Sequence, residues 1–232
     1  MEQLIFELAT PEPPVFGNFV AGANAEAVAT LRRIAVGDDS ETGVVVWGAP
    51  GVGKSHLLRA AVAEALAAGR SARYVANAAD VDAVPSDAAA FIAVDNVDAA
   101  DPAAQGRLFT LYNALAASRG QLAAAAHRAP ARLALRDDLR TRLGHGLVFE
   151  VVALADDDKA AALAVYARER GFGLSGDVIG YLLAHGRRDM ASLVAALAAL
   201  DRMSLSAKRP ISVALLREWL QRPGSRARAA EE

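Results

Sequence analysis

Short apolar runs alternate with helical patterns between residues 24 and 153. In the stretch near 102–118, for example, Leu108, Leu111, Tyr112 and Leu115 recur at helical spacing. The apolar runs are residues 43–47, 73–76, 91–95, 122–126 and 147–152, and the helical patterns lie near 24–36, 54–68, 102–118 and 136–143. Strands that alternate with helices predict an α/β fold, a parallel sheet flanked by helices on both faces.

Residues at the ends of these patterns predict where helices begin and end. Asn24 stands where an N-cap is expected, and its side chain could accept a bond from the first helical turn. Gly69 and Gly120 follow helical patterns and are typical of C-caps, where the backbone turns left-handed.

The pattern changes after about residue 153, where strand-like runs stop. Helical patterns at 157–169, 176–184, 189–205 and 212–221 predict a small all-helical lid domain. We therefore divide the chain into four parts: an N-terminal arm, an α/β domain, the lid and a C-terminal tail expected to be disordered. Their bounds are 1–14, 15–153, 154–221 and 222–232.

Composition narrows the classes of function. The chain has 232 residues and a net charge of −2, which argues against general nucleic-acid binding through bulk charge. It has no cysteine, and its four histidines do not pair at metal-ligand spacing, so neither disulfides nor structural zinc are expected. We find neither a secretory signal nor a long uncharged apolar run, and we expect a cytoplasmic protein with no membrane contact.

Residues 48–55 match the phosphate-binding pattern G-x-x-x-x-G-K-[ST]. The match follows a predicted strand and opens a predicted helix, as the motif requires. Its glycines let backbone N–H groups surround phosphates, Lys54 would reach the β- and γ-phosphates, and Ser55 would bind Mg²⁺. The predicted nucleotide-binding residues of the loop are Gly48, Pro50, Gly51, Val52, Gly53, Lys54 and Ser55.

A second Mg²⁺ ligand is predicted at the end of the apolar run 91–95. There Asp95 would meet the metal through water. ATPases of this build usually place an acid next, to orient the attacking water. Here Asn96 follows, and a neutral amide cannot accept the proton of that water.

Together the phosphate loop, the aspartate-ending strand and the helical lid resemble the AAA+ class. The sequence GKSHLL, with His56 after the serine, resembles the loop of the initiator DnaA and its relatives, and residues 15–28 resemble the segment before their nucleotide site. Residues 139–146 resemble their box VII, with Arg142 at the arginine-finger position. Residues 186–193 resemble their sensor II helix, with Arg188 at the phosphate-sensing position.

This resemblance covers nearly all of residues 15–221. DnaA has a further C-terminal helix-turn-helix domain and a longer N-terminus, for which this chain is expected to have no room. The chain is therefore more similar to the Hda family, short DnaA homologues that inactivate DnaA after initiation. In that family the residue after the magnesium-site aspartate is often Asn, as at Asn96 here.

The N-terminal arm resembles the sliding-clamp-binding motif Q-L-x-L-x-L. Gln3 would hydrogen-bond in a small polar pocket of the clamp, while Leu4, Phe6 and Leu8 would fill an apolar groove. The same residues alternate with period two, so an edge strand is the alternative. The position of the arm ahead of the proline-rich residues 11–14 favours the clamp motif.

Residues 123–130 depart from the family pattern. Small polar residues and an Asp-Arg pair are expected there, whereas Ala125, Ala126, His127 and Arg128 are present. We interpret His127 as a surface residue at a strand end, and the loss of polar groups as evidence against hydrolysis in this chain's own site.

For Arg142, the pattern alone is also compatible with a solvated charged helix or a salt bridge to Asp137 or Asp138.

The resemblance implies a regulator of replication initiation. Such a regulator would hold ADP or ATP with Mg²⁺ and would be tethered to the DNA polymerase III sliding clamp (beta subunit). It would then insert Arg142 into the nucleotide site of ATP-bound DnaA and stimulate hydrolysis there. DNA contact would be indirect, through the clamp, and a homodimer is possible. The alternatives are a helicase loader of the DnaC type, a small-molecule P-loop kinase, or a stand-alone DnaA-related ATPase.

Overall fold

The computed structural model describes residues 13–83 and 90–221. Its centre is a five-stranded sheet in the order β2-β3-β4-β1-β5, and every neighbouring pair is parallel. The strands are β1 (Gly43–Trp47), β2 (Ala72–Val75), β3 (Phe91–Val94), β4 (Gln121–Ala126) and β5 (Leu147–Glu150). The predicted α/β sheet is confirmed, and the strand ends differ from the prediction by two residues at most.

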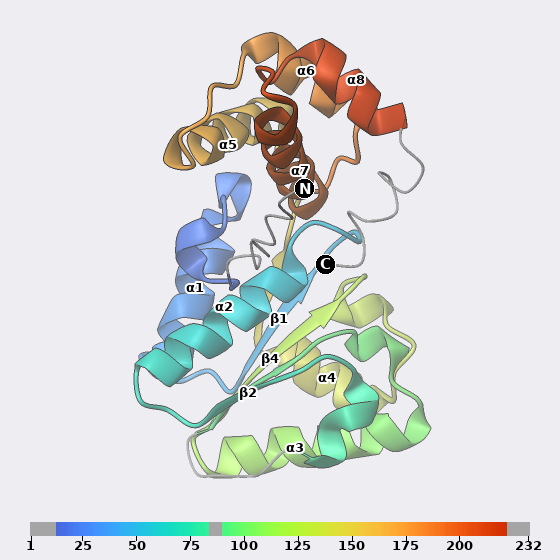
Figure 1. Cartoon of the computed structure of the whole chain (residues 1–232). Coiled ribbons are helices and arrows are strands. Elements are labelled where there is room, and N and C mark those ends of the chain that lie inside the picture. The colour runs from blue at the N-terminus through green and yellow to red at the C-terminus, as the bar shows by residue number, and fades with distance from the viewer. Residues whose placement is uncertain (1–12, 84–89, 222–232) are drawn as a thin grey trace.

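Helices cover both faces of this sheet (Figure 1). On one face, α1 (Ala25–Val36) and α2 (Lys54–Ala67) pack against Val44 and Val46. On the other face, α3 (Pro102–Ala117) and α4 (Asp137–His145) pack around Val45. Neighbouring residues of β1 thus point into different cores, which explains why the central strands are apolar throughout rather than alternating.

The lid consists of α5 (Asp156–Glu169), α6 (Gly176–His185), α7 (Met190–Ala207) and α8 (Val213–Gln221). These helices share a separate apolar core. By length and composition alone, α7 could cross a membrane. Its buried residues, including Leu193, Leu197 and Leu200, pack in the lid core, which accounts for its apolar character.

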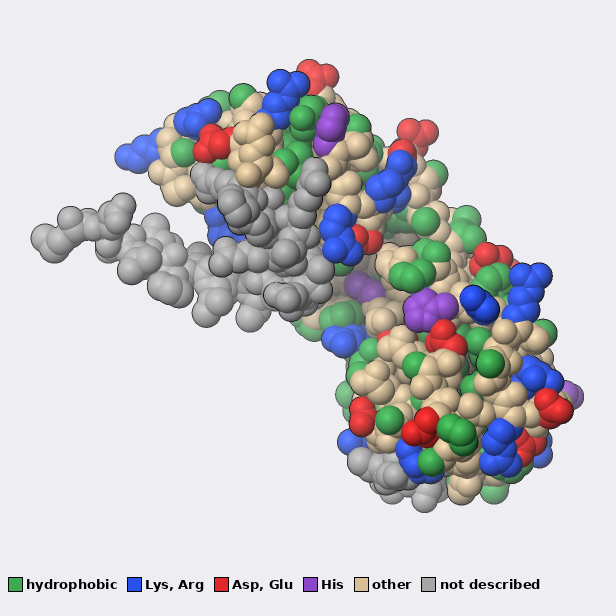
Figure 2. All heavy atoms as spheres, turned by 90° about the vertical axis from the view of Figure 1, so that its right-hand side faces the viewer, with side chains coloured by type: hydrophobic (Ala, Val, Ile, Leu, Met, Phe, Trp, Pro, Cys, Tyr) green, Lys and Arg blue, Asp and Glu red, His purple; other side chains and the backbone are tan. Residues whose placement is uncertain are grey.

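Acidic and basic side chains are interspersed over the surface shown in Figure 2. This agrees with the small net charge of the chain, −2. The surface seen there carries no continuous basic stripe of the kind that general nucleic-acid binders use.

Asn24 does not cap α1, contrary to the prediction. It occupies the N-cap position, but its side chain makes no capping bond. Instead, its Nδ2 donates to the carbonyl of Val152 at 3.0 Å, and its Oδ1 accepts from the Val152 N–H at 2.9 Å. Val152 lies between β5 and the lid, so the buried Asn24 ties the start of the α/β domain to the connection between the two domains.

Replacing Asn24 with alanine removes both bonds at once. We expect the free energy of unfolding to fall by about 1–3 kcal/mol, because one buried side chain satisfies two backbone groups. Urea denaturation followed by circular dichroism measures the loss. Asn77→Ala, at an exposed position, is the control; equal midpoints for the two variants would contradict the role of Asn24.

Gly120 is not the left-handed C-cap residue that the sequence predicted. The left-handed residue after α3 is Arg119, with φ 57°. A Cβ on Gly120 would lie 2.8 Å from the Ala90 carbonyl and 2.6 Å from Leu115 Cδ2. Glycine is therefore required there because the chain passes too close to its neighbours for a side chain. Gly69, with φ 75°, does have the left-handed backbone that was predicted.

Candidate nucleotide site and candidate arginine finger

The phosphate loop joins β1 to α2, as predicted. A Cβ on Gly48 would lie 2.3 Å from the carbonyl oxygen of Val151, and one on Gly53 would lie 2.7 Å from the Phe19 ring. Gly51 and Gly53 have φ of 79° and 101°, values that favour glycine. The loop thus depends on glycine for both its turns and its close packing, which suits a backbone cradle for phosphate.

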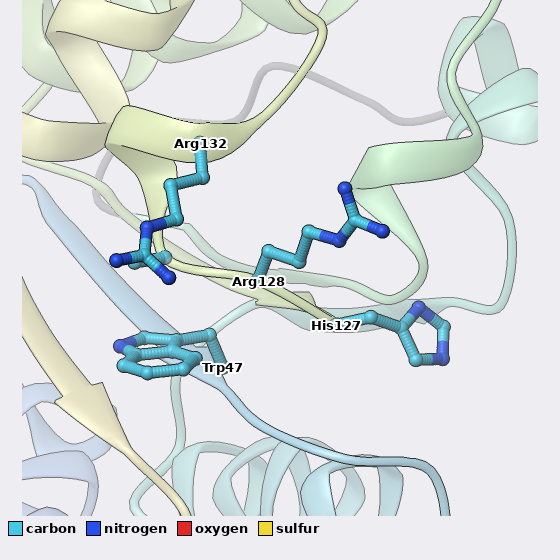
Figure 3. Close-up of a pocket in the computed structure, with 5 residues that line it drawn as sticks. Trp47, His127, Arg128 and Arg132 are labelled. Atoms are coloured by element: carbon cyan, nitrogen blue, oxygen red, sulfur yellow. The ribbon is translucent and has the colours of Figure 1, made fainter.

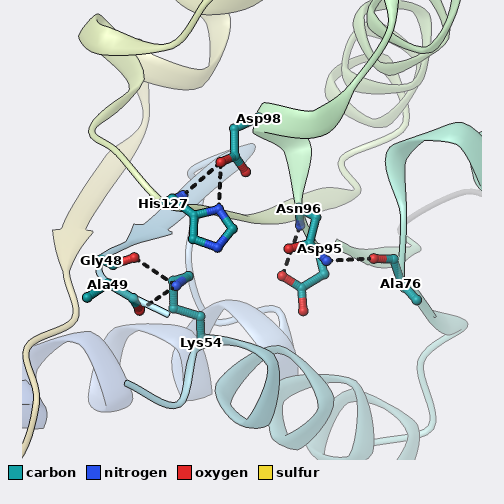
Figure 4. A network of polar contacts seen from close by, with 8 residues as sticks. All are labelled: Gly48, Ala49, Lys54, Ala76, Asp95, Asn96, Asp98 and His127. Atoms are coloured by element: carbon teal, nitrogen blue, oxygen red, sulfur yellow. Dashed lines mark hydrogen bonds and ion pairs between the residues drawn. The ribbon is translucent and has the colours of Figure 1, made fainter. Parts of the chain in front are cut away.

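Lys54 lies inside this loop. Its side chain is buried, and Nζ donates to the carbonyls of Gly48 and Ala49 at 2.8 and 2.9 Å (Figure 4). Burial lowers the pKa of the Lys54 ammonium from its ordinary value, and the carboxylates of Asp95 and Asp98 oppose that shift. A cation held within a glycine-rich turn is well suited to binding a phosphate chain.

Asp95 directly follows β3 and is buried. The hydroxyl of Tyr74 donates to its Oδ2 at 2.8 Å, and the Asn96 N–H donates to its Oδ1 at 2.9 Å. These bonds fix the carboxylate, and sequence reasoning missed Tyr74 because the contact joins two different strands. Asp95 and Ser55 offer the oxygen ligands that Mg²⁺ prefers, and the metal would neutralise phosphate charge there.

Asn96 is oriented away from any role in activating water. Its backbone is left-handed, with φ 53°, which asparagine tolerates better than most residues. Its side-chain Nδ2 donates to the Ala76 carbonyl at 3.1 Å, beyond the end of β2. The amide therefore holds two strand ends together, as Figure 4 shows.

His56 binds the segment that precedes α1. Its Nε2 donates to the Val15 carbonyl at 3.1 Å, and its ring contacts Phe19 at a centroid distance of 5.5 Å. Burial lowers the pKa of His56, although the bond to Val15 acts in the other direction. Because Phe19 also touches Gly53, His56 places this segment beside the phosphate loop.

Asp189 is the lid residue nearest Gly51. A Cβ on Gly51 would lie 3.2 Å from the Asp189 Cβ. Although burial acts to raise its pKa, bonds from Ser192 and Arg187 keep the pKa of Asp189 below its ordinary value. The neighbouring Arg188 donates instead to both oxygens of Asp156 at 2.6 Å, and the structure places its guanidinium on the lid.

Arg142 lies exposed in the last turn of α4. Among the described residues, its guanidinium lies 5.9 Å from the centre of the Tyr112 ring and forms no ion pair. The two nearby acids are engaged by other arginines: Asp137 by Arg140 at 2.6 Å, and Asp138 by Arg136 at 2.7 Å. Arg142 is therefore available to a partner molecule.

His127 directly follows β4 and is exposed at the surface, as predicted, and it is paired with Asp98. Its Nδ1 lies 2.6 Å from Oδ2 of Asp98, and its backbone N–H donates to the same oxygen at 3.3 Å. Both residues lie close to the phosphate loop and Asp95 (Figure 4). Sequence reasoning missed Asp98, although it stands only three residues beyond Asp95.

A hollow of about 390 Å³ opens at the same end of the sheet. It is lined by Trp47, His127, Arg128, Ala129 and Arg132. Figure 3 shows the Arg132 guanidinium beside Trp47, while the Arg128 side chain and the His127 ring point away from Trp47. The imidazole is therefore directed out of this hollow.

The clamp-motif residues Gln3, Leu4, Phe6 and Leu8 lie outside the described residues. Within residues 13–83 and 90–221, no group of three or more His, Asp or Glu side chains could hold a metal ion by itself.

Several solved structures share this fold. Domain III of the DnaA replication initiation protein from Thermotoga maritima superposes with a TM-score of 0.76 at 17% identity, over 90% of this chain and 97% of that one. AMPPCP-bound DnaA from Aquifex aeolicus gives 0.68 at 21%, over 81% and 65%. The Holliday junction branch migration motor RuvB of Thermotoga maritima gives 0.67 at 14%, over 89% and 70%.

The five-stranded parallel sheet, the phosphate loop and the helical lid give this chain the AAA+ fold that these structures share. The lid identifies a narrower relationship, because residues 156–220 match the family model described as "Hda, lid domain". The lid match and the DnaA-like fold together support an Hda-like, DnaA-related AAA+ protein.

Proposed function

We propose that this chain is a regulator of replication initiation that stimulates hydrolysis of DnaA-bound ATP. It binds nucleotide at its phosphate loop and supplies Arg142 as an arginine finger to the nucleotide site of DnaA. An arginine supplied in trans stabilises the charge that develops on the transferring phosphoryl group.

Nucleotide binding is supported by the geometry of the loop. Gly48, Gly51 and Gly53 leave the backbone open to phosphate, Lys54 provides a cation, and Ser55 with Asp95 would hold Mg²⁺. A DnaA with the same fold binds AMPPCP. Asn96 is engaged with Ala76 and its amide cannot accept a proton, so no base for hydrolysis stands at this position, and we take ADP as the nucleotide carried.

The exposure of Arg142 is the observation that carries the proposal. A finger must reach beyond its own molecule, and a guanidinium in a local salt bridge would have to break that bond first. Arg142 has no such bond among the described residues, because Arg136 and Arg140 already pair with the neighbouring acids.

The arm at residues 1–14 would tether the chain to the sliding clamp, which brings DNA close without direct binding. Tethering raises the local concentration of the finger near DnaA on the same DNA. This arrangement places the protein in the cytoplasm, at the nucleoid.

The tether is tested with Gln3→Ala combined with Leu4→Ala. We expect this variant to lose retention on immobilised clamp and clamp-dependent stimulation of DnaA–ATP hydrolysis, while its thermal unfolding stays unchanged. The loss is expected because the variant removes a polar anchor and an apolar anchor from a short linear motif. The matched control is Glu2→Ala with Glu7→Ala; full clamp retention by the Gln3/Leu4 variant would exclude the motif.

A further inference from the structure

His127 occupies the space between the two halves of the candidate nucleotide site. In the sheet, β4 lies between β3, which leads to Asp95, and β1, which leads to the phosphate loop. The carbonyl of Ala126, the last residue of β4, accepts from the Gly48 N–H at 3.2 Å. The next residue, His127, therefore emerges beside the loop and on the side that faces Asp95.

The bond to Asp98 determines which nitrogen of His127 is available. A carboxylate only accepts, so the proton of the neutral ring lies on Nδ1 and is donated to Asp98 Oδ2 at 2.6 Å. Nε2 then carries a lone pair and makes no bond to the described residues. Figure 4 shows the ring directed toward Lys54 and Asp95, which bracket the place where phosphates would lie.

Asp98 is itself held in place. It lies in the short 3-10 helix Val97–Ala99 that follows Asp95, and its Oδ2 also accepts the backbone N–H of His127. Its Oδ1 is buried without a partner among the described residues. The carboxylate is thus held against the imidazole, an arrangement that orients a histidine side chain.

We infer that the Asp98–His127 pair is the proton acceptor for hydrolysis of ATP in this chain's own site. Water attacks the γ-phosphorus and gives its proton to Nε2 of His127. The bond from that phosphorus to the β–γ bridging oxygen breaks, and the bridging oxygen leaves with ADP. His127 later releases the proton to solvent, so ATP and water yield ADP and phosphate.

This inference rests on the proposed nucleotide binding and deepens it. Asn96 stands where related ATPases place an acid, but it bonds to Ala76 and has no basic atom to offer. His127 supplies the missing base from the neighbouring strand. The chain would then generate its ADP-bound form from ATP without help from DnaA.

The test is a single-turnover assay of ATP hydrolysis with the full chain alone, compared between wild type and His127→Gln. We expect a measurable wild-type rate and a loss of about 10²- to 10⁴-fold in the variant, the usual contribution of a general base. Affinity for ADP should change by less than about twofold, because ADP lacks the γ-phosphate. His145→Gln, on α4, is the matched control and should keep the wild-type rate.

Two additional variants separate chemistry from structure. Imidazole added to His127→Ala should restore part of the rate, whereas a purely structural histidine would not be replaced by a soluble base. Asp98→Asn should lower the rate while leaving ADP affinity unchanged, because Asp98 acts as a positioning residue.

An undetectable wild-type rate, an unchanged rate in His127→Gln, or an equal loss of ADP affinity would overturn the inference. Different results would contradict the proposed function: a wild-type chain that binds no nucleotide, or one that does not stimulate hydrolysis of DnaA-bound ATP. ADP-loaded His127→Gln should still stimulate DnaA, since the finger at Arg142 is intact.

Discussion

Replacing Arg142 with alanine is expected to lower stimulation of DnaA–ATP hydrolysis by about 10³- to 10⁵-fold, the range that arginine fingers provide. The guanidinium is exposed at the end of α4, lies 5.9 Å from the centre of the Tyr112 ring and forms no ion pair among the described residues. Its removal therefore disturbs little of the chain's own packing. Nucleotide binding, clamp binding and the unfolding midpoint should stay within experimental error of the wild type.

The control for this experiment is Arg140→Ala, two residues away on the same helix. Arg140 pairs with Asp137 and donates to the Leu135 carbonyl, so its guanidinium is already in use. We expect it to keep most of the stimulation. If Arg142→Ala still stimulates DnaA and Arg140→Ala does not, the finger is Arg140 and the assignment made here is wrong. The readout is phosphate release from DnaA–ATP with DNA-loaded clamp present.

Replacing Lys54 with alanine is expected to weaken ADP binding by about 10- to 100-fold. A hydrogen bond to a charged group contributes about 1.5–3 kcal/mol, and about 1.4 kcal/mol corresponds to a factor of ten in affinity. In addition, Lys54 bonds the carbonyls of Gly48 and Ala49, so its loss also removes two contacts that order the loop. Isothermal titration with ADP measures the effect.

Lys208→Ala provides a control that also removes one positive charge, at the exposed end of α7. It should bind ADP like the wild type. Circular dichroism of Lys54→Ala should show an intact fold, because a buried ammonium without a carboxylate contact adds little to stability. Wild-type ADP affinity in Lys54→Ala would rule out the phosphate loop as the nucleotide site.

Local patterns in the sequence were sufficient to predict the order of strands and helices. Apolar runs that alternate with helical periodicity predicted all five strands and the four helices of the lid, because burial of apolar surface follows from residue spacing alone. The phosphate loop was also predicted residue by residue, since glycines, lysine and serine at fixed spacing determine its shape. Asp95 followed from its place after a buried strand.

Side chains that act over long sequence distances were assigned less well. Asn24 was predicted to cap a helix because the nearest unsatisfied N–H groups are local, yet it bonds Val152, 128 residues away. The exposure of His127 at a strand end was predicted, but its pairing was not, because Asp98 lies 29 residues earlier, in the 3-10 helix Val97–Ala99. Each pairing depends on which strand ends lie next to each other in the sheet.

The sequence by itself determined the secondary structure, the phosphate loop and the resemblance to a DnaA-related family, because each depends on residues close together in the chain. Only the tertiary structure decided which side chains share a bond. It paired Arg188 with Asp156, turned Asn96 toward Ala76, and left Arg142 without a carboxylate partner in residues 13–83 and 90–221. The physical reason is that a charged group engages the partner that the fold brings within about 3 Å, and spacing along the chain does not specify that distance.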